Sequence, residues 1–348
     1  MRFFQFQRDA RGQTRRLLWW FAVMLALLLL AINGVLALAW QVTVGGGLDY
    51  PRHFFSVNSG VTLLFVFGGW WVEASQLSQG GEALARRLGA REVRPASSDD
   101  ERRYAQVVQE LAIAAGMRPP QAMVLPREAA INAFATGWHP ADAVVAVTQG
   151  ALESLTREEL QGMVAHELSH LREGDTRLNM RLAGMVFGLE MIYRLGQSLM
   201  QPDDHGRRHI GFVLGVAIMA VGWLGWLAGH ALQAAVSRQR EFLADARAVQ
   251  WTRQREGLGR VLRKVAGQWQ RGQVAQQLRQ PSVQHMLLVS GETGRLARWL
   301  DAHPPLEQRI ARVYGGRMPP LAPNDGRDPA LPVPAGRVPA VPSFVLKD

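Results

Sequence analysis

The sequence of 348 residues contains no cysteine. This absence excludes a disulfide framework and a thiolate metal site. Any transition metal must therefore be held by histidine, aspartate or glutamate. Histidine itself is scarce, with nine residues in the whole chain. Two histidines at a metal-ligand spacing therefore favour a metal site over a coincidence.

Acidic residues are in the minority, because 29 Asp and Glu face 39 Lys and Arg and leave a formal net charge of +10. A basic chain suits nucleic acid or an anionic membrane surface. The sequence has no zinc-finger, homeodomain or RNA-binding signature. Hydrophobic residues make up 48% of the chain and gather in long runs. We therefore expect a lipid bilayer as a partner and no nucleic acid.

Two apolar runs near the N-terminus predict a transmembrane hairpin. Residues 17–40 include no charged residue, and their number matches a helix that crosses a hydrocarbon core of roughly 30 Å. The run is too long for the apolar region of a signal peptide, and no small-residue cleavage site follows it. The shorter run 54–72 predicts a second span, with a buried hairpin partner as the alternative. Tryptophans mark the ends of these runs, as at a membrane interface.

Arginines flank this hairpin on one side. They precede the first run and follow the second, whereas the loop between the runs contains only Arg52. By the positive-inside rule, the N-terminus and the region after the second run face the cytoplasm.

Two further apolar segments follow in the middle of the chain. Residues 210–236 form a long apolar run in which Gly211 to Gly215 and Gly225 to Gly229 have the spacing that lets membrane helices pack closely. Residues 180–200 are less apolar, because they include Glu190 and Arg194, which are spaced to form an ion pair on a helix. An amphipathic helix buried against a catalytic domain is the alternative to a span here.

The region between the two pairs of apolar segments has the composition of a soluble domain. After a polar linker over 95–103, the pattern predicts a helix over 104–116. Short strand-like runs bounded by proline and glycine follow at 122–125, 130–137 and 143–148. They predict a small sheet.

The next segment predicts a well-capped helix. Thr156 with Glu159 three residues later is typical of a capping box, and Gly174 is a plausible stop. Apolar residues recur at helical spacing on one face between these ends: Leu160, Met163, Val164, Leu168 and Leu171.

Inside this helix lies the sequence His-Glu-Leu-Ser-His. His166 and His170 are four residues apart, so both imidazoles can reach one Zn²⁺ from the same face. Glu167 lies about 100° around the helix, where a catalytic base can approach the reacting water without binding the metal. The alternative is a chance pair of histidines on an amphipathic helix.

A catalytic zinc needs a third protein ligand. The best candidate is Glu241, on a predicted helix that continues from the apolar run 210–236. Asp245 follows one turn later and can accept the outer N–H of a ligand histidine. The alternative for Glu241 is an ordinary ion pair with Arg238 or Arg240. For His170 and Glu241 to meet, the chain between them must cross the membrane an even number of times or form a hairpin that never crosses fully.

At this point the chain resembles the HtpX-type membrane metalloproteases, which are relatives of the CAAX prenyl proteases. The matching motifs are HELSH, NAFATG at 132–137, REFLADA at 240–246 and HPPLEQRI at 303–310. The resemblance extends from the first span to about Tyr314. It implies a mainly helical α+β fold, in which multi-pass transmembrane helices accompany a zincin-like (gluzincin) catalytic domain with a small sheet.

The resemblance also implies roles for single residues. Glu241 would be the third zinc ligand, and His303 would lie near the scissile carbonyl, with a plain turn histidine as the alternative. Arg309 would be a structural partner in the same motif. Asn132, Ala133 and Phe134 would bind substrate as an edge strand, by β-augmentation.

These inferences predict five regions along the chain. Residues 1–76 are the N-terminal hairpin, 77–178 and 237–316 the two parts of the protease domain, 179–236 two membrane or membrane-associated helices, and 317–348 a disordered Pro-rich tail.

The function implied is a zinc endopeptidase of the bacterial inner membrane with its active site in the cytoplasm. It would cleave misfolded or damaged membrane proteins or unfolded polypeptides under stress. The alternatives are a processing protease with a defined substrate and a non-catalytic membrane chaperone or scaffold with structural zinc. There are too few spans for the large chamber of the prenyl proteases.

Overall fold

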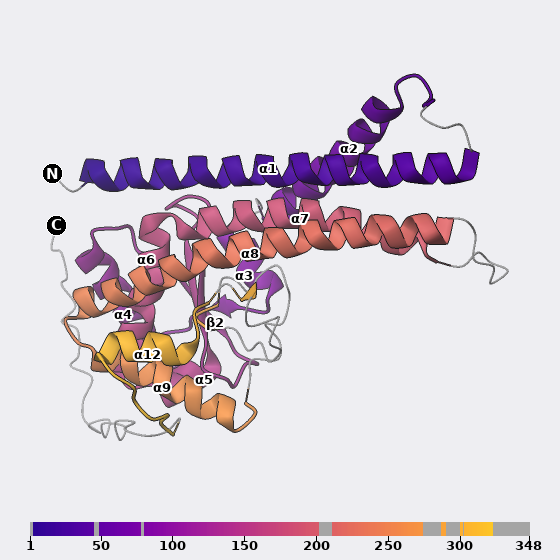
Figure 1. Ribbon diagram of the computed structural model, residues 1–348. Helices are drawn as coiled ribbons and strands as arrows, with labels where there is room; N and C mark the ends of the chain where they lie inside the picture. The colour runs from indigo at the N-terminus through magenta and orange to yellow at the C-terminus, as the bar shows by residue number, and fades with distance from the viewer. Residues whose placement is uncertain are drawn as a thin grey trace, which may run out of the picture.

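Long helices lie along one side of the molecule, and a compact unit of helices and strands lies against one end of them (Figure 1). The computed structural model describes residues 3–44, 49–77, 80–201, 211–273, 287–289, 300–301 and 303–322. The predicted fold class, mainly helical with a small sheet, is confirmed.

Three helices are long and apolar enough to cross a membrane, which makes this a multi-pass membrane protein. They are α1 (Phe3–Val44), α2 (Phe54–Leu77) and α8 (Gly211–Thr252), and the candidate spans within them are Trp19–Val44, Phe54–Ser75 and Gly211–Thr252. Large apolar side chains such as Leu30, Leu64 and Val213 are exposed on all three helices. Exposure of this kind is stable against lipid rather than water.

The helix α7 (Asp175–Leu199) lies antiparallel to α8 and completes a helical hairpin (Figure 1). Gly196 of α7 lies against Met219, and Gly222 of α8 lies against Tyr193, so glycines let the two backbones approach closely. The predicted ion pair between Glu190 and Arg194 is present at 2.9 Å. Among the described helices, α7 is not one of the three candidate spans.

One member of each glycine pair predicted from the sequence, Gly215 and Gly229, packs closely against α7, whereas Gly211 and Gly225 do not. A Cβ at Gly215 would lie 2.9 Å from Gly196 O of α7, which is a tight contact. A Cβ at Gly211 would lie 3.8 Å from Leu199 O, which is an ordinary one. A Cβ at Gly225 would lie 3.4 Å from Leu28 Cδ1 of α1, and a Cβ at Gly229 would lie 3.1 Å from Leu189 Cδ1 of α7. The reason is that α8 contacts helices on two sides, α7 and α1, so its small residues do not all face one partner.

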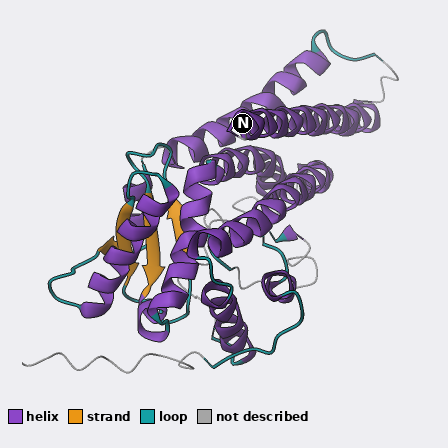
Figure 2. Cartoon of the chain, turned by 90° about the vertical axis from the view of Figure 1, so that its left-hand side faces the viewer, coloured by secondary structure: helices purple, strands orange, loops and turns teal. Residues whose placement is uncertain are grey.

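The sheet has four strands, β1 (Arg91–Glu92), β2 (Gln121–Leu125), β3 (Ala133–Thr136) and β4 (Val144–Thr148). Their order is β1-β2-β4-β3, with β2 and β4 parallel and the other pairs antiparallel. The strand-like runs of the sequence are confirmed, with β3 at the outer edge of the four. Figure 2 shows helices packed against this sheet.

Seven described helices surround the sheet or lie beside it. The predicted helix 104–116 begins earlier, at Asp99, because Ser98 caps it and three acidic residues fill its first turn. The helices are α3 (Gly81–Arg87), α4 (Asp99–Ala115), α5 (Gln149–Ser154), α6 (Arg157–Glu173), α9 (Glu256–Gln270), α12 (Leu306–Tyr314) and the start of α7.

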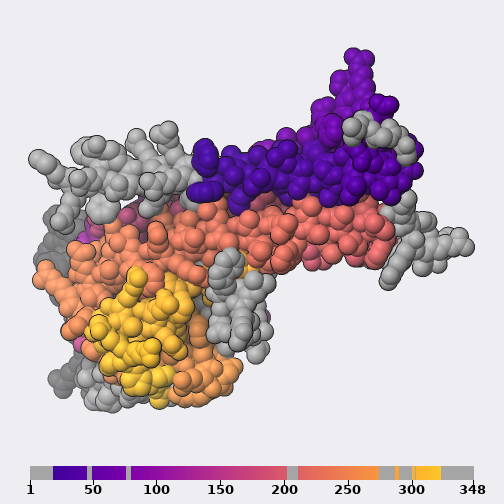
Figure 3. Space-filling view, viewed as in Figure 1, coloured from indigo at the N-terminus to yellow at the C-terminus, as the bar shows by residue number. Residues whose placement is uncertain are grey.

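The helix α6 lies at the centre of the main core. Four of its five predicted apolar positions are fully buried, and Leu171 is partly buried. A buried ion pair of 2.7 Å between Lys264 of α9 and Glu159 fixes the first turn of α6. Figure 3 shows the surface of α8 running as a continuous band from the hairpin end to the compact unit of helices and strands. One helix therefore joins the membrane and the core.

The Pro-rich tail is described only at its beginning. Leu321 N donates to Arg263 O at 3.0 Å, and Arg263 Nε donates to Pro319 O at 2.7 Å, so this first part packs on α9. Residues 323–348, which were predicted to be disordered, lie outside the described residues.

We expect Gly222→Ala to loosen the α7–α8 hairpin, because the new Cβ would lie 2.4 Å from Tyr193 N. Overpacking of this kind costs about 1–3 kcal/mol. The matched control is Gly60→Ala on α2, whose Cβ would meet nothing within 4 Å. Unfolding of the purified protein in detergent measures both variants. Equal stability of the two would contradict the close packing.

Candidate metal centre

The helix α6 is held rigidly at both ends. Both hydrogen bonds of the predicted capping box are present between Thr156 and Glu159. Gly174 ends the helix in the left-handed conformation, with φ 73°, as predicted for a stop. The two histidines of α6 lie in its buried last turns, so their backbone positions are well fixed.

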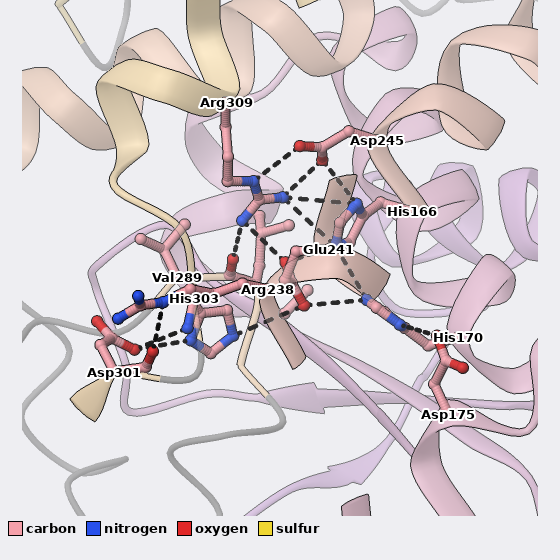
Figure 4. A network of polar contacts seen from close by, with 12 residues as sticks. His166, His170, Asp175, Arg238, Glu241, Asp245, Val289, Asp301, His303 and Arg309 are labelled. Atoms are coloured by element: carbon pink, nitrogen blue, oxygen red, sulfur yellow. Dashed lines mark hydrogen bonds and ion pairs between the residues drawn. The ribbon is translucent and has the colours of Figure 1, made fainter. Parts of the chain in front are cut away.

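His166, His170 and Glu241 form a compact group, as Figure 4 shows. The two Nε2 atoms are 3.1 Å apart. Glu241 Oε2 lies 3.5 Å from His166 Nε2, and Glu241 Oε1 lies 3.3 Å from His170 Nε2. All three residues are well covered from solvent. The structure thus brings together the three metal ligands expected from the sequence, from α6 and the far end of α8.

A second layer of carboxylates holds the outer nitrogens of these histidines. Asp245 Oδ1 lies 3.0 Å from His166 Nδ1, as predicted, and Asp175 Oδ2 lies 3.0 Å from His170 Nδ1. A carboxylate at Nδ1 fixes the proton there, so the Nε2 lone pairs of both imidazoles face the same point. Such an arrangement suits a metal ion.

Asp175 is a site residue that sequence reasoning missed. The signal available was an acidic residue immediately after the helix stop at Gly174, at the first position of the next helix. Its other carboxylate oxygen pairs with Arg240. The two arginines that the sequence offered as ion-pair partners of Glu241 have other contacts, because Arg240 pairs with Asp175 and Arg238 Nε donates to Asp301 O. Glu241 itself lies 3.1 Å from Arg309.

Arg309 of α12 compensates the negative charge of the centre. Its guanidinium donates to both oxygens of Asp245, at 2.9 and 2.7 Å, and its Nη1 lies 3.1 Å from Glu241 Oε2. Burial opposes the charged form of Arg309, but Asp245 and Glu241 outweigh it and raise the pKa of this side chain. Arg309 therefore stays a cation and joins α12 to α8.

Glu167 is buried beside the two histidines and differs from the other acids of the site. Neither of its carboxylate oxygens has a hydrogen-bond partner among the described residues. Burial raises the pKa of the Glu167 carboxyl, while His166 and His170 act in the opposite direction. A buried carboxylate with no protein partner is suited to exchange a proton with a bound molecule.

His303 lies at the other side of Glu241. Its Nε2 is 3.9 Å from Glu241 Oε1 and has no hydrogen-bond partner among the described residues. Asp301 holds the ring through Nδ1 at 3.3 Å and the backbone through N at 2.9 Å. Burial alone would lower the pKa of His303, but Glu241 and Asp301 raise it. Its free nitrogen faces the centre.

The residues predicted to bind substrate lie at and just before the start of β3. Asn132 Oδ1 accepts a hydrogen bond from Ala133 N, and Asn132 Nδ2 donates to Val289 O at 3.0 Å. Ala133 and Phe134 begin β3 itself. The outer side of this strand is not open along its whole length, because the short segment 287–289 lies against it.

Together with the apolar helices, this arrangement is that of a membrane metallopeptidase. Residues 98–315, well over half of the chain, match the sequence profile of peptidase family M48. The chain therefore belongs to peptidase family M48 and, within it, to the HtpX-type proteases.

The relatives cover much of the chain. The chain is 37% identical to the Protease HtpX homolog of Dictyoglomus thermophilum over 210 residues, 60% of this chain and 67% of that protein. It is 31% identical to the Protease HtpX homolog of Lactobacillus acidophilus over 293 residues, 81% of this chain and 95% of that protein. The crystal structure of Ste24p from S. mikatae is similar with a TM-score of 0.42 and 16% identity, covering 86% of this chain and 66% of that one.

We expect Asp175→Asn to weaken metal binding by about 10–100-fold, because the amide holds His170 less firmly than the carboxylate does. Competition with a chromogenic chelator measures the affinity. The control is Glu173→Gln, two residues away, where the acid pairs with Arg247 instead of a ligand. An unchanged affinity in Asp175→Asn would show that this carboxylate does not support the metal site.

Proposed function

We propose that the chain is a zinc-dependent endopeptidase of the bacterial inner membrane. Its substrates are misfolded or damaged membrane proteins and unfolded polypeptides, cleaved at the cytoplasmic face. One observation supports this proposal most strongly. The buried carboxylate of Glu167, which has no hydrogen-bond partner among the described residues, lies beside a group of three residues that could hold a metal ion.

The donor groups of the three residues suit zinc. In a tetrahedral site with bonds of the usual length, neighbouring ligand atoms are about 3.3 Å apart. The two Nε2 atoms are 3.1 Å apart, and the Glu241 carboxylate places Oε2 3.5 Å from His166 Nε2 and Oε1 3.3 Å from His170 Nε2. Two imidazoles and one carboxylate also form the ligand set of many catalytic zinc sites. A structural zinc would need a fourth protein ligand at bonding distance.

A bound zinc ion supplies a Lewis acid that polarises the scissile carbonyl and makes water a stronger nucleophile. The residues of the chain then have distinct tasks. Glu167 accepts a proton from the attacking water and gives it to the leaving amine. His303 Nε2 stabilises the negative charge that develops on the carbonyl oxygen. Asp245 and Asp175 hold the ligand histidines in place.

The position of the site favours substrates at the membrane surface. Glu241 follows the apolar run that ends at Val236 by only about five residues, or roughly 8 Å of helix. β3 lies beside α6 in the same unit and offers backbone groups to an extended chain. Unfolded loops and termini of membrane proteins have both properties, because they are extended and lie close to the bilayer.

Two alternatives make different predictions. A processing protease has the same chemistry but a single substrate sequence, so a panel of unrelated unfolded polypeptides distinguishes the two. A chaperone or scaffold with structural zinc has no use for a buried base. The unpaired carboxylate of Glu167 therefore disfavours that alternative.

We expect Glu167→Gln to keep its zinc and its fold but to lose at least about 100-fold in cleavage rate, because the amide cannot accept the proton. The substrate is an unfolded membrane-protein fragment in detergent, and zinc content is measured on the same sample. Glu158→Gln is the matched control, since Glu158 is exposed on the same helix. Normal cleavage by Glu167→Gln would remove the mechanism.

We expect the loop between α1 and α2 to face away from the cytoplasm and the catalytic unit to face it. The chain has no native cysteine, so a single new one reports its own position. A membrane-impermeant maleimide should label Arg52→Cys in intact spheroplasts but Glu153→Cys only after lysis. The opposite labelling pattern would invert the orientation.

A further inference from the structure

We propose that residues Leu287–Val289 are an internal ligand of the substrate-binding edge, which an extended peptide must displace before it is cleaved. This inference rests on the proposed function, because it assigns the edge of β3 to peptide binding. It goes further by naming the segment that occupies the edge in the free enzyme. It also names the kind of side chain that the edge accepts.

The segment is bound to β3 as a substrate strand would be. Leu287 lies directly opposite Phe134 in an antiparallel bridge. Leu288 N donates to Ala133 O at 2.8 Å. An outward-facing carbonyl on the outer strand of a sheet is the group that a peptide uses in β-augmentation. The carbonyl of Ala133 is therefore already hydrogen-bonded to the segment.

Two polar side chains of the site bind the carbonyls of the same segment. Asn132 Nδ2 donates to Val289 O at 3.0 Å, and Arg309 Nη1 donates to Leu288 O at 2.6 Å. The same Nη1 lies 3.1 Å from Glu241 Oε2, so the Leu288 carbonyl and a metal ligand share one nitrogen. The backbone of the segment therefore runs immediately beside the metal centre.

The side chains of the segment show what the edge accepts. Leu287, Leu288 and Val289 are 5%, 1% and 5% exposed, and they belong to the two core clusters on either side of the sheet. Leu287 lies in the cluster that contains Phe134. Any peptide that replaces the segment fills the same spaces. The pockets therefore select extended peptides with aliphatic residues of the size of leucine and valine, which unfolded membrane proteins expose.

Competition follows from the shared contacts. Ala133 O, Asn132 Nδ2 and Arg309 Nη1 cannot serve the segment and a peptide along the same stretch of β3 at the same time. The enzyme with the segment in place is the inactive form, and the fraction without it sets the apparent affinity for substrate. Substrates that match the Leu-Leu-Val pattern then compete best.

A reversible cross-link tests this proposal. Phe134→Cys with Leu287→Cys places two thiols at directly opposite positions of an antiparallel pair, where the Cβ separation suits a disulfide. No native cysteine interferes. The probe is a short quenched-fluorescent peptide with Leu-Leu-Val at its centre. We expect the oxidised protein to cleave it at least about tenfold more slowly than the same protein after reduction, with equal metal content.

Equal rates before and after reduction would overturn the proposal, because the segment would then be a fixed strand that substrate never displaces. Wild-type protein treated with the same oxidant and reductant is the control. Cleavage by the wild type distinguishes failure of the internal ligand from failure of the proposed function. If wild type with full metal does not cleave the peptide or an unfolded polypeptide, the proposed function fails, whereas failure of the internal ligand leaves wild-type cleavage intact.

A matched pair of proline variants decides the question if the double-cysteine protein does not fold. Leu288→Pro removes the N–H that binds Ala133 O, whereas Leu287→Pro removes an N–H that makes no such contact to β3 among the described residues. We expect Leu288→Pro to have a KM for the peptide several-fold below that of Leu287→Pro, at equal zinc content. A KM that is equal or higher would contradict the proposal.

Discussion

The meeting of Glu241 with His166 and His170 is the constraint on which the rest of the structure depends. The two histidines belong to α6, and the glutamate arrives at the end of a helix that begins far away at Gly211. The chain leaves α6 along α7 and must return along α8 to bring Glu241 to the two histidines. Glycines at the α7–α8 contact allow that return, despite the charged pair Glu190–Arg194 on α7. The packing of the apolar helices therefore determines whether the metal ligands meet.

Charge balance is the second constraint on the site. Three acids, Glu241, Asp245 and Asp175, lie within reach of two imidazoles in a buried space. Buried carboxylates are stable only when cations compensate them. Arg309 pairs with Asp245 and Glu241, and Arg240 pairs with Asp175. Glu167 alone is left without such a partner among the described residues, which separates the residue that would do chemistry from those that support it.

Much of this site could be predicted from the sequence, because its central part is local. Histidines one turn apart, a capping box and a stop glycine need no tertiary information. Glu241 and Asp245 could be proposed as candidates from their spacing on one helix, but the role of Glu241 as the third ligand was implied by the family resemblance. The two-residue strand β1 and the contact between β3 and Leu287 depend on distant segments, so no periodicity reports them. Asp175 was missed because its role arises from the left-handed residue Gly174 between α6 and α7 rather than from helical spacing.

The central claim is that two imidazoles and the Glu241 carboxylate bind one metal ion. Zinc X-ray absorption of the purified protein, recorded beside Glu241→Ala, tests it most directly. The account predicts a first shell of two imidazole nitrogens with additional oxygen in wild type, and loss of bound zinc or a changed oxygen shell in the variant. Identical spectra at equal zinc content would show that Glu241 is not a ligand and would contradict the account.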